Sequence, residues 1–167
     1  MIYTPCFKHA DDAVVHLRSA MPYIADPLSE PMYVGFMAVV ATTAYEIAIK
    51  EIFINFAKKK HKVFGNFTKN HFDRINGRIT IAAIKGEHLK RFGDVYLRRF
   101  EKKLDDAEKE HLKLYRRSIK TAYSNIIEWR NNFVHGGKNT QATCSETISA
   151  YEDGKKIIHS LSEAMIR

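Results

Sequence analysis

The side chains best suited to chemistry in this chain lie together around position 130. Arg130, Asn131, Asn132 and His135 fall within six residues, and a pair of glycines follows directly. A guanidinium holds phosphate oxygens as a planar fork, and an imidazole takes and gives a proton near neutral pH. These two groups are the minimum equipment for cleaving a phosphodiester without a metal ion. We therefore take Arg130, Asn131 and His135 as candidate catalytic residues, with Asn132 in support.

Helical geometry separates the two principal groups of this cluster. Successive residues of an α-helix rotate by about 100°, so Arg130 and His135 point about 140° apart on an ideal helix. Either the helix unwinds before Gly136, or a second copy of the chain completes the site; we expect both, in a symmetric dimer. Asn131 lies one turn before His135 on the polar face, where its amide could bond the imidazole and hold its tautomer.

Arg130 interrupts an apolar sector of its helix, where a charge is costly without a partner. The guanidinium could simply reach water along an apolar stem. Alternatively, an acidic side chain holds the guanidinium partly buried. Glu46, isolated in the most apolar helix, is the candidate partner. His135 could likewise be only a cation suited to the negative end of a helix. Lys138 follows the glycines and is placed to contact phosphate.

The elements that must position these groups are all helices in the sequence pattern. Asp11 and Asp12 open an amphipathic helix that reaches about Met21, and prolines 22, 27 and 31 indicate a loop. Residues 32–57 contain only three charges, which is typical of a helix at the centre of a bundle. Gly65 and Asn66 indicate a break. Residues 68–105 predict two or three short helices, with turns at 76–77 and 92–94.

The later part of the chain carries the clearest periodicity. From Leu112 to Phe133, apolar residues alternate at spacings of three and four, which predicts one continuous helix ended by the glycine pair. Thr143 and Glu146 have the form of a capping box and begin a last helix. We therefore predict an all-α, single-domain, up-and-down bundle with a long central helix and short accessory helices. Residues 1–30 form its N-terminal helix and Pro-rich loop, and residues 31–167 form the core bundle.

The charge of the chain is uneven. Of its 167 residues, 27 are Lys or Arg and 19 are Asp or Glu, a net charge of +8. Residues 58–138 hold twenty-one of these cations against nine acids, an excess of twelve. A basic face attracts polyanions through counterion release, although single exposed lysines often serve only solubility. The clustering favours a nucleic-acid partner.

The composition also indicates the cellular compartment in which we expect the protein. The two cysteines, Cys6 and Cys144, form neither a metal-ligand spacing nor a disulfide framework, and the first residues lack the order of a secretory signal. Polar residues interrupt the apolar stretch 34–49, so we do not expect it to span a membrane. A cytoplasmic protein without a metal or other cofactor, and without a membrane partner, is the expectation.

These features resemble the HEPN superfamily (higher eukaryotes and prokaryotes nucleotide-binding domains). Its signature is an Arg, a polar residue, three variable residues and a His, which Arg130, Asn131 and His135 match. Residues 43–46 (Thr-Ala-Tyr-Glu) and 150–155 (Ala-Tyr-Glu-Asp-Gly-Lys) look like its RiboL-PSP branch. The resemblance covers roughly residues 30–166. It implies a helical bundle, a homodimer with a composite ribonuclease site, and a role in toxin–antitoxin or host-defence systems. The resemblance also bears on regulation. Toxins of this kind that are inactivated by nucleotidyl transfer onto a Tyr carry that Tyr two residues after the His. Gly137 stands at that position here, so we do not expect this form of inactivation.

The leading hypothesis is a metal-independent endoribonuclease that leaves 2′,3′-cyclic phosphate and 5′-hydroxyl ends. His135 would be the general acid/base, Arg130 would hold the scissile phosphate, and Asn131 would orient one or the other. One alternative is a non-catalytic module that binds RNA or a nucleotide. Another is an assembly partner that docks a second copy, a cognate antitoxin or another defence-system protein.

Overall fold

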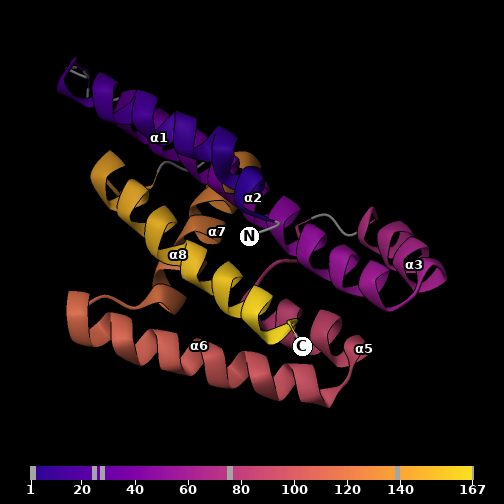
Figure 1. Ribbon diagram of the computed structural model, residues 1–167. Helices are drawn as coiled ribbons and strands as arrows, with labels where there is room; N and C mark the ends of the chain where they lie inside the picture. Colours follow the sequence, from indigo (N-terminus) through magenta and orange to yellow (C-terminus); the bar gives the residue numbers. More distant parts are fainter. Residues whose placement is uncertain (1–2, 24–25, 27–28, 75–76, 138–139, 167) are drawn as a thin grey trace.

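The computed structural model describes residues 3–23, 26, 29–74, 77–137 and 140–166, and all regular structure within them is helical (Figure 1). The predicted all-α bundle is therefore confirmed. The long helices are α1 (Lys8–Ala20), α2 (Ser29–Lys60), α3 (Lys62–Phe72), α6 (Asp94–Tyr115), α7 (Ile119–Gly136) and α8 (Cys144–Ala164). The shorter turns are η1 (Thr4–Phe7), η2 (Met21–Tyr23), α4 (Ile81–Ala83), the π-helical η3 (Ile84–Leu89) and α5 (Lys90–Phe92).

Helix α2 is the centre of the bundle, as its lack of charge predicts. It packs against α1, α3, α7 and α8, and Figure 1 shows α8 lying between the α1–α2 pair and α6. By length and hydropathy alone α2 could cross a membrane, but 61% of its most apolar window is buried inside the bundle. The helix begins earlier than predicted, because Pro31 lies in its first turn, where a missing N–H costs nothing. Pro27 lies outside the described residues.

Three buried tyrosines join α2, α7 and α8. Tyr45 stacks between Tyr123 and Tyr151, with ring centroids 5.0 and 5.8 Å away. The Tyr45 hydroxyl donates to the Tyr151 carbonyl at 2.7 Å, and the Tyr123 hydroxyl donates to the Ile79 carbonyl at 2.7 Å. Burial raises the pKa of Tyr123, so its phenol stays a neutral donor. These bonds fix the position of α7 relative to the rest of the core.

The continuous helix predicted from residue 112 to residue 133 is wrong, because the chain turns between α6 and α7. Arg116 adopts a left-handed conformation (φ 58°), and the Ser118 hydroxyl caps the first turn of α7. The Glu108 carboxylate accepts two further N–H groups of that turn. Leu112 and Tyr115 are 40% and 56% exposed and do not belong to the packing seam. The apolar spacing continues through the turn, but Ser118 and Glu108 accept the N–H groups at the start of a new helix.

The middle of the chain also departs from the prediction. Gly65 lies inside α3, and a Cβ there would come within 2.6 Å of Lys58 Cγ, so this glycine permits close helix packing and is not a break. Residues 94–115 form one long helix, α6, although residues 81–92 are short segments as predicted. The turns at Gly77 (φ 73°) and Gly93 (φ 110°) are confirmed.

The predictions of a first and a last helix are confirmed, with a small shift in where the first one begins. Helix α1 begins at Lys8, three residues before the acidic pair that was expected to open it. Helix α8 begins after Thr143, whose hydroxyl accepts from the Glu146 N–H while the Glu146 carboxylate accepts from the Thr143 N–H. The capping box is confirmed, and it fixes where α8 begins beside the end of α7.

Candidate active site

The candidate catalytic residues lie on the last two turns of α7. The helix continues without interruption to Gly136, and Gly137 (φ 54°) closes it by donating its N–H to the Asn132 carbonyl. A positive φ favours glycine, so the predicted end of the helix is confirmed. The predicted unwinding before Gly136 is wrong. Lys138 lies outside the described residues.

Arg130 and His135 meet within one chain. Arg130 Nη1 lies 3.1 Å from His135 Nε2 and 2.9 Å from Asn131 Oδ1. One helix therefore brings the two side chains into contact, which their divergence of about 140° on an ideal helix did not predict. Because α7 is helical at both residues, the contact requires the long arginine side chain to reach around the last turn. A second copy is not needed to pair these groups.

The contact between Arg130 and His135 identifies which imidazole nitrogen is the acceptor. A guanidinium carries only donors, so His135 Nε2 must be the acceptor and its ring proton must lie on Nδ1. His135 is exposed and Arg130 is half-buried, so both are open to a ligand. A phosphate that binds the guanidinium would compete with this bond and release the Nε2 lone pair, which is what a general base requires.

Asn131 has a different partner from the one predicted. Its Oδ1 accepts from Arg130 instead of bonding His135, because the guanidinium lies between the two side chains. Asn131 therefore positions the Arg130 guanidinium directly and the imidazole only through it. Asn132 is half-buried and, with Asn131 and Thr80, lines a pocket of about 350 Å³ beside α7.

The predicted pairing of Arg130 with Glu46 is wrong. The Glu46 carboxylate lies 2.7 Å from Lys50 Nζ, one turn later on α2, and accepts the Gly77 N–H at 2.9 Å. A lysine one helical turn away reaches a carboxylate with little loss of side-chain freedom. Glu46 therefore anchors the turn before α4 to the central helix, and Arg130 takes its partners from its own helix.

Sequence reasoning missed the contact that seats this end of α7 on α2. The ring of Phe133 lies directly against Gly35, and any Cβ at position 35 would overlap its Cγ, Cδ2 and Cε2 atoms. The same ring borders an apolar groove of about 810 Å³ between α1 and α2, where Met32 and Phe36 are more than half exposed. A lone glycine inside the most apolar helix was the available signal, because a helix interior disfavours glycine unless a neighbour comes close.

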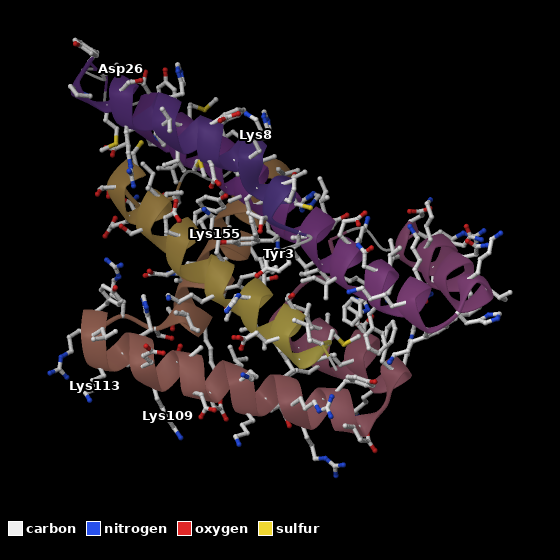
Figure 2. All side chains as sticks on the ribbon, in the orientation of Figure 1. Tyr3, Lys8, Asp26, Lys109, Lys113 and Lys155 are labelled. Carbon is white, nitrogen blue, oxygen red and sulfur yellow. The ribbon has the colours of Figure 1, made fainter. Side chains whose placement is uncertain are left out.

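The protein has many exposed cations, but most lie away from the Arg130–His135 cluster, because Phe133 packs on Gly35 and Lys58 follows about six helical turns further along α2. Exposed cations extend along the junction of α2 and α3 and along α6, where Lys109 and Lys113 point away from the bundle (Figure 2). Among the described residues, no group of three or more His, Cys, Asp or Glu side chains is arranged to hold a metal ion. What the site offers is a guanidinium, an imidazole and an amide.

A comparison with protein families decides the relationship. The RiboL-PSP-HEPN family profile matches residues 8–167, which includes α1 to α8 and the whole Arg130–His135 cluster. The chain belongs to this family. Comparisons of this HEPN domain with curated proteins and with solved structures gave no match. Membership supports a nuclease-like module, and the resemblance predicted from Arg130, Asn131 and His135 is confirmed at the level of the family.

Proposed function

We propose that this HEPN domain is a metal-independent endoribonuclease whose active site is built on Arg130 and His135. The observation that carries the proposal is the 3.1 Å contact between Arg130 Nη1 and His135 Nε2 at an accessible helix end. It places a proton acceptor beside a fixed positive charge, the two groups that cleavage of a phosphodiester without a metal ion requires. Asn131 supports the arrangement by holding the guanidinium at 2.9 Å.

In the proposed reaction, the scissile phosphate of RNA displaces His135 from the Arg130 guanidinium. His135 Nε2 then takes the proton of the adjacent 2′-hydroxyl, and the 2′-oxygen attacks phosphorus. The phosphorus–O5′ bond breaks, and the leaving oxygen takes a proton from an imidazolium. Arg130 stabilises the negative charge that develops on the phosphoryl oxygens. The products are a 2′,3′-cyclic phosphate and a 5′-hydroxyl.

The surface charge supports RNA as the substrate. The excess of twelve positive charges in residues 58–138 belongs to the segment that ends at the active site. Each phosphate that the protein neutralises releases counterions, so binding should weaken steeply with salt.

The dimer is part of the proposal, although pairing Arg130 with His135 no longer requires it. Its support is the apolar groove beside Phe133, where Met32 and Phe36 are 55% and 54% exposed. A twofold contact there would bring the two α7 ends close and supply a second imidazole as the general acid. We further propose a cytoplasmic toxin or host-defence role, with a cognate antitoxin or another defence-system protein as its partner.

Replacing the imidazole tests the catalytic proposal. Purified His135→Ala should lose cleavage of RNA, whereas His9→Ala, which removes an exposed histidine of α1, should cleave as the wild type does. EDTA should leave the rate unchanged, and end analysis should find 2′,3′-cyclic phosphates. Cleavage by His135→Ala at the wild-type rate would end the proposal. In cells, expression of the wild type should slow growth, and Arg130→Ala should relieve it.

One observation favours a second function, binding without cleavage. The Nε2 lone pair of His135 is already occupied by Arg130. If a bound phosphate fails to break that contact, the domain holds RNA with no base available for the 2′-hydroxyl. This alternative predicts salt-sensitive RNA binding in both the wild type and His135→Ala, and no turnover at high protein concentration.

A further inference from the structure

We infer that the groove between α7 and α8 binds a nucleobase of the RNA, stacked on Trp129 and read by side-chain amides and hydroxyls. This inference rests on the proposed function, because it assigns the base-binding subsite of the same substrate. The groove has a volume of about 650 Å³. Nothing in the catalytic proposal uses it.

The groove follows from the helical spacing of its two walls. Residues four apart share a helix face, so each wall presents one stripe of side chains. The stripes are Thr121, Asn125 and Trp129 on α7, and Ser145, Ser149 and Asp153 on α8. Between them, Ala122 and Ala150 are buried and form the floor. Small side chains at the floor and longer ones at the walls leave an open channel between two packed helices.

The lining suits the edge and face of a base. Trp129 is half-buried, so its indole is held by the core while one part stays open to the groove. Aromatic faces stack on any base, and amides such as those of Asn125 and Gln141 both donate and accept hydrogen bonds. Ser145 and Ser149 add hydroxyls on the opposite wall. A flat, uncharged heterocycle with polar edges matches this set.

The charged groups of the groove disfavour a phosphate there. Asp153 is buried, and its carboxylate binds Arg117 through two contacts of 2.9 and 3.2 Å and lies 3.0 Å from His111 Nε2. Arg117 is therefore already committed to a carboxylate. Glu146, at the other end, is committed to the α8 capping box. Two carboxylates and no free cation along the described lining favour the uncharged part of a nucleotide.

The groove is also correctly placed relative to the catalytic groups. Trp129 immediately precedes Arg130 on α7, so the indole and the guanidinium project from adjacent faces of the same turn. Thr140 and Gln141, just beyond the catalytic helix end, close the groove on that side. An RNA strand whose phosphate binds Arg130 can therefore place a neighbouring base in the groove.

The protein carries its own probe, since Trp129 is the only tryptophan of the chain. We would titrate the full-length His135→Ala protein, which cannot consume RNA under the proposed mechanism, with adenosine 5′-monophosphate and follow tryptophan emission. Saturable quenching is expected with the nucleotide and not with ribose 5-phosphate, which has the phosphate but no base. A short oligoadenylate should quench at lower concentration than the mononucleotide, because it offers several bases to the groove and an adjoining phosphate to Arg130. Quenching by the mononucleotide and none by the oligonucleotide would overturn RNA as the source of the base.

A matched pair of variants tests the assigned residues. Asn125→Ala should weaken nucleotide binding about 10-fold, the loss expected for one well-placed hydrogen bond. Asn70→Ala, at an exposed asparagine of α3, should bind as the parent does. In the cleaving protein, Trp129→Ala should raise KM about 10- to 100-fold, and Trp129→Phe should restore most of the loss, because a phenyl ring still stacks.

Three further results would overturn the inference. They are equal quenching by ribose 5-phosphate, no quenching by either nucleotide ligand, and an emission change that depends on protein concentration alone, which would place a second copy in the groove. The proposed function fails separately. If the wild type binds nucleotides as described and never cleaves RNA, the base subsite stands and the nuclease does not.

Discussion

Replacing Gly35 by Ala should disturb both the stability of the bundle and the geometry of the site. A Cβ at position 35 would overlap three ring carbons of Phe133, although ordinary carbon–carbon contacts are about 3.5 Å. The ring, or the end of α7 that carries it, must therefore move by on the order of 1 Å. Arg130 and His135 lie on the same two turns, so the movement reaches the proposed catalytic groups.

The expected size of the stability change follows from two opposing effects. Overpacking a close contact costs about 1–3 kcal/mol, and exchanging a helical glycine for alanine returns about 1 kcal/mol. The net loss for Gly35→Ala is therefore about 1 kcal/mol, which lowers Tm by about 2–4 °C in a chain of this length. A 1 Å error in positioning can cost about 100-fold in rate, so RNA cleavage should fall by about 10- to 100-fold.

Calorimetry and cleavage kinetics measure these two effects separately. Gly86→Ala is the matched control, because no atom lies within 4 Å of a Cβ built there, and it should lose neither stability nor activity. Phe133→Ala removes the obstructing ring, so adding Gly35→Ala to that variant should cost no further stability. If Gly35→Ala alone melts at or above the wild-type Tm and cleaves normally, the inferred contact between α2 and α7 is wrong.

Two further predictions concern buried titratable side chains. Burial lowers the pKa of His88, whose Nε2 bonds the Arg78 carbonyl at 2.8 Å, so the unfolded chain takes up the proton first and Tm should fall as pH drops below about 6.5. His88→Gln keeps an N–H for that carbonyl and should flatten the fall in a melting series; an unchanged slope would contradict the assignment. Arg117→Ala leaves the buried Asp153 carboxylate without its cation and should cost about 1–3 kcal/mol in denaturant unfolding, whereas Arg117→Ala combined with Asp153→Ala, which removes that carboxylate as well, should cost less. Equal losses for the two variants would show that the pair, and not the buried carboxylate, is what matters.

Local chemistry made much of the fold predictable. The lack of charge in residues 32–57 identified the central helix, because an element that is apolar on all sides must be covered on all sides. Thr143 with Glu146, and Gly137, marked helix ends, because unpaired N–H and C=O groups at a terminus need nearby partners. The turn between α6 and α7 was missed because apolar periodicity continues through it. Only the bonds made by Glu108 and Ser118 show that a new helix begins there.

For the site, the sequence by itself determined which groups are present: a guanidinium, an amide and an imidazole on one helix end closed by a glycine. The tertiary structure decided how they pair. It brought Arg130 onto His135 within one chain, tied Glu46 to Lys50 instead, and set Phe133 against Gly35. The physical reason is that residue type and helical period depend on near neighbours in the chain. Side-chain reach and packing between helices depend on distances that only the assembled bundle defines.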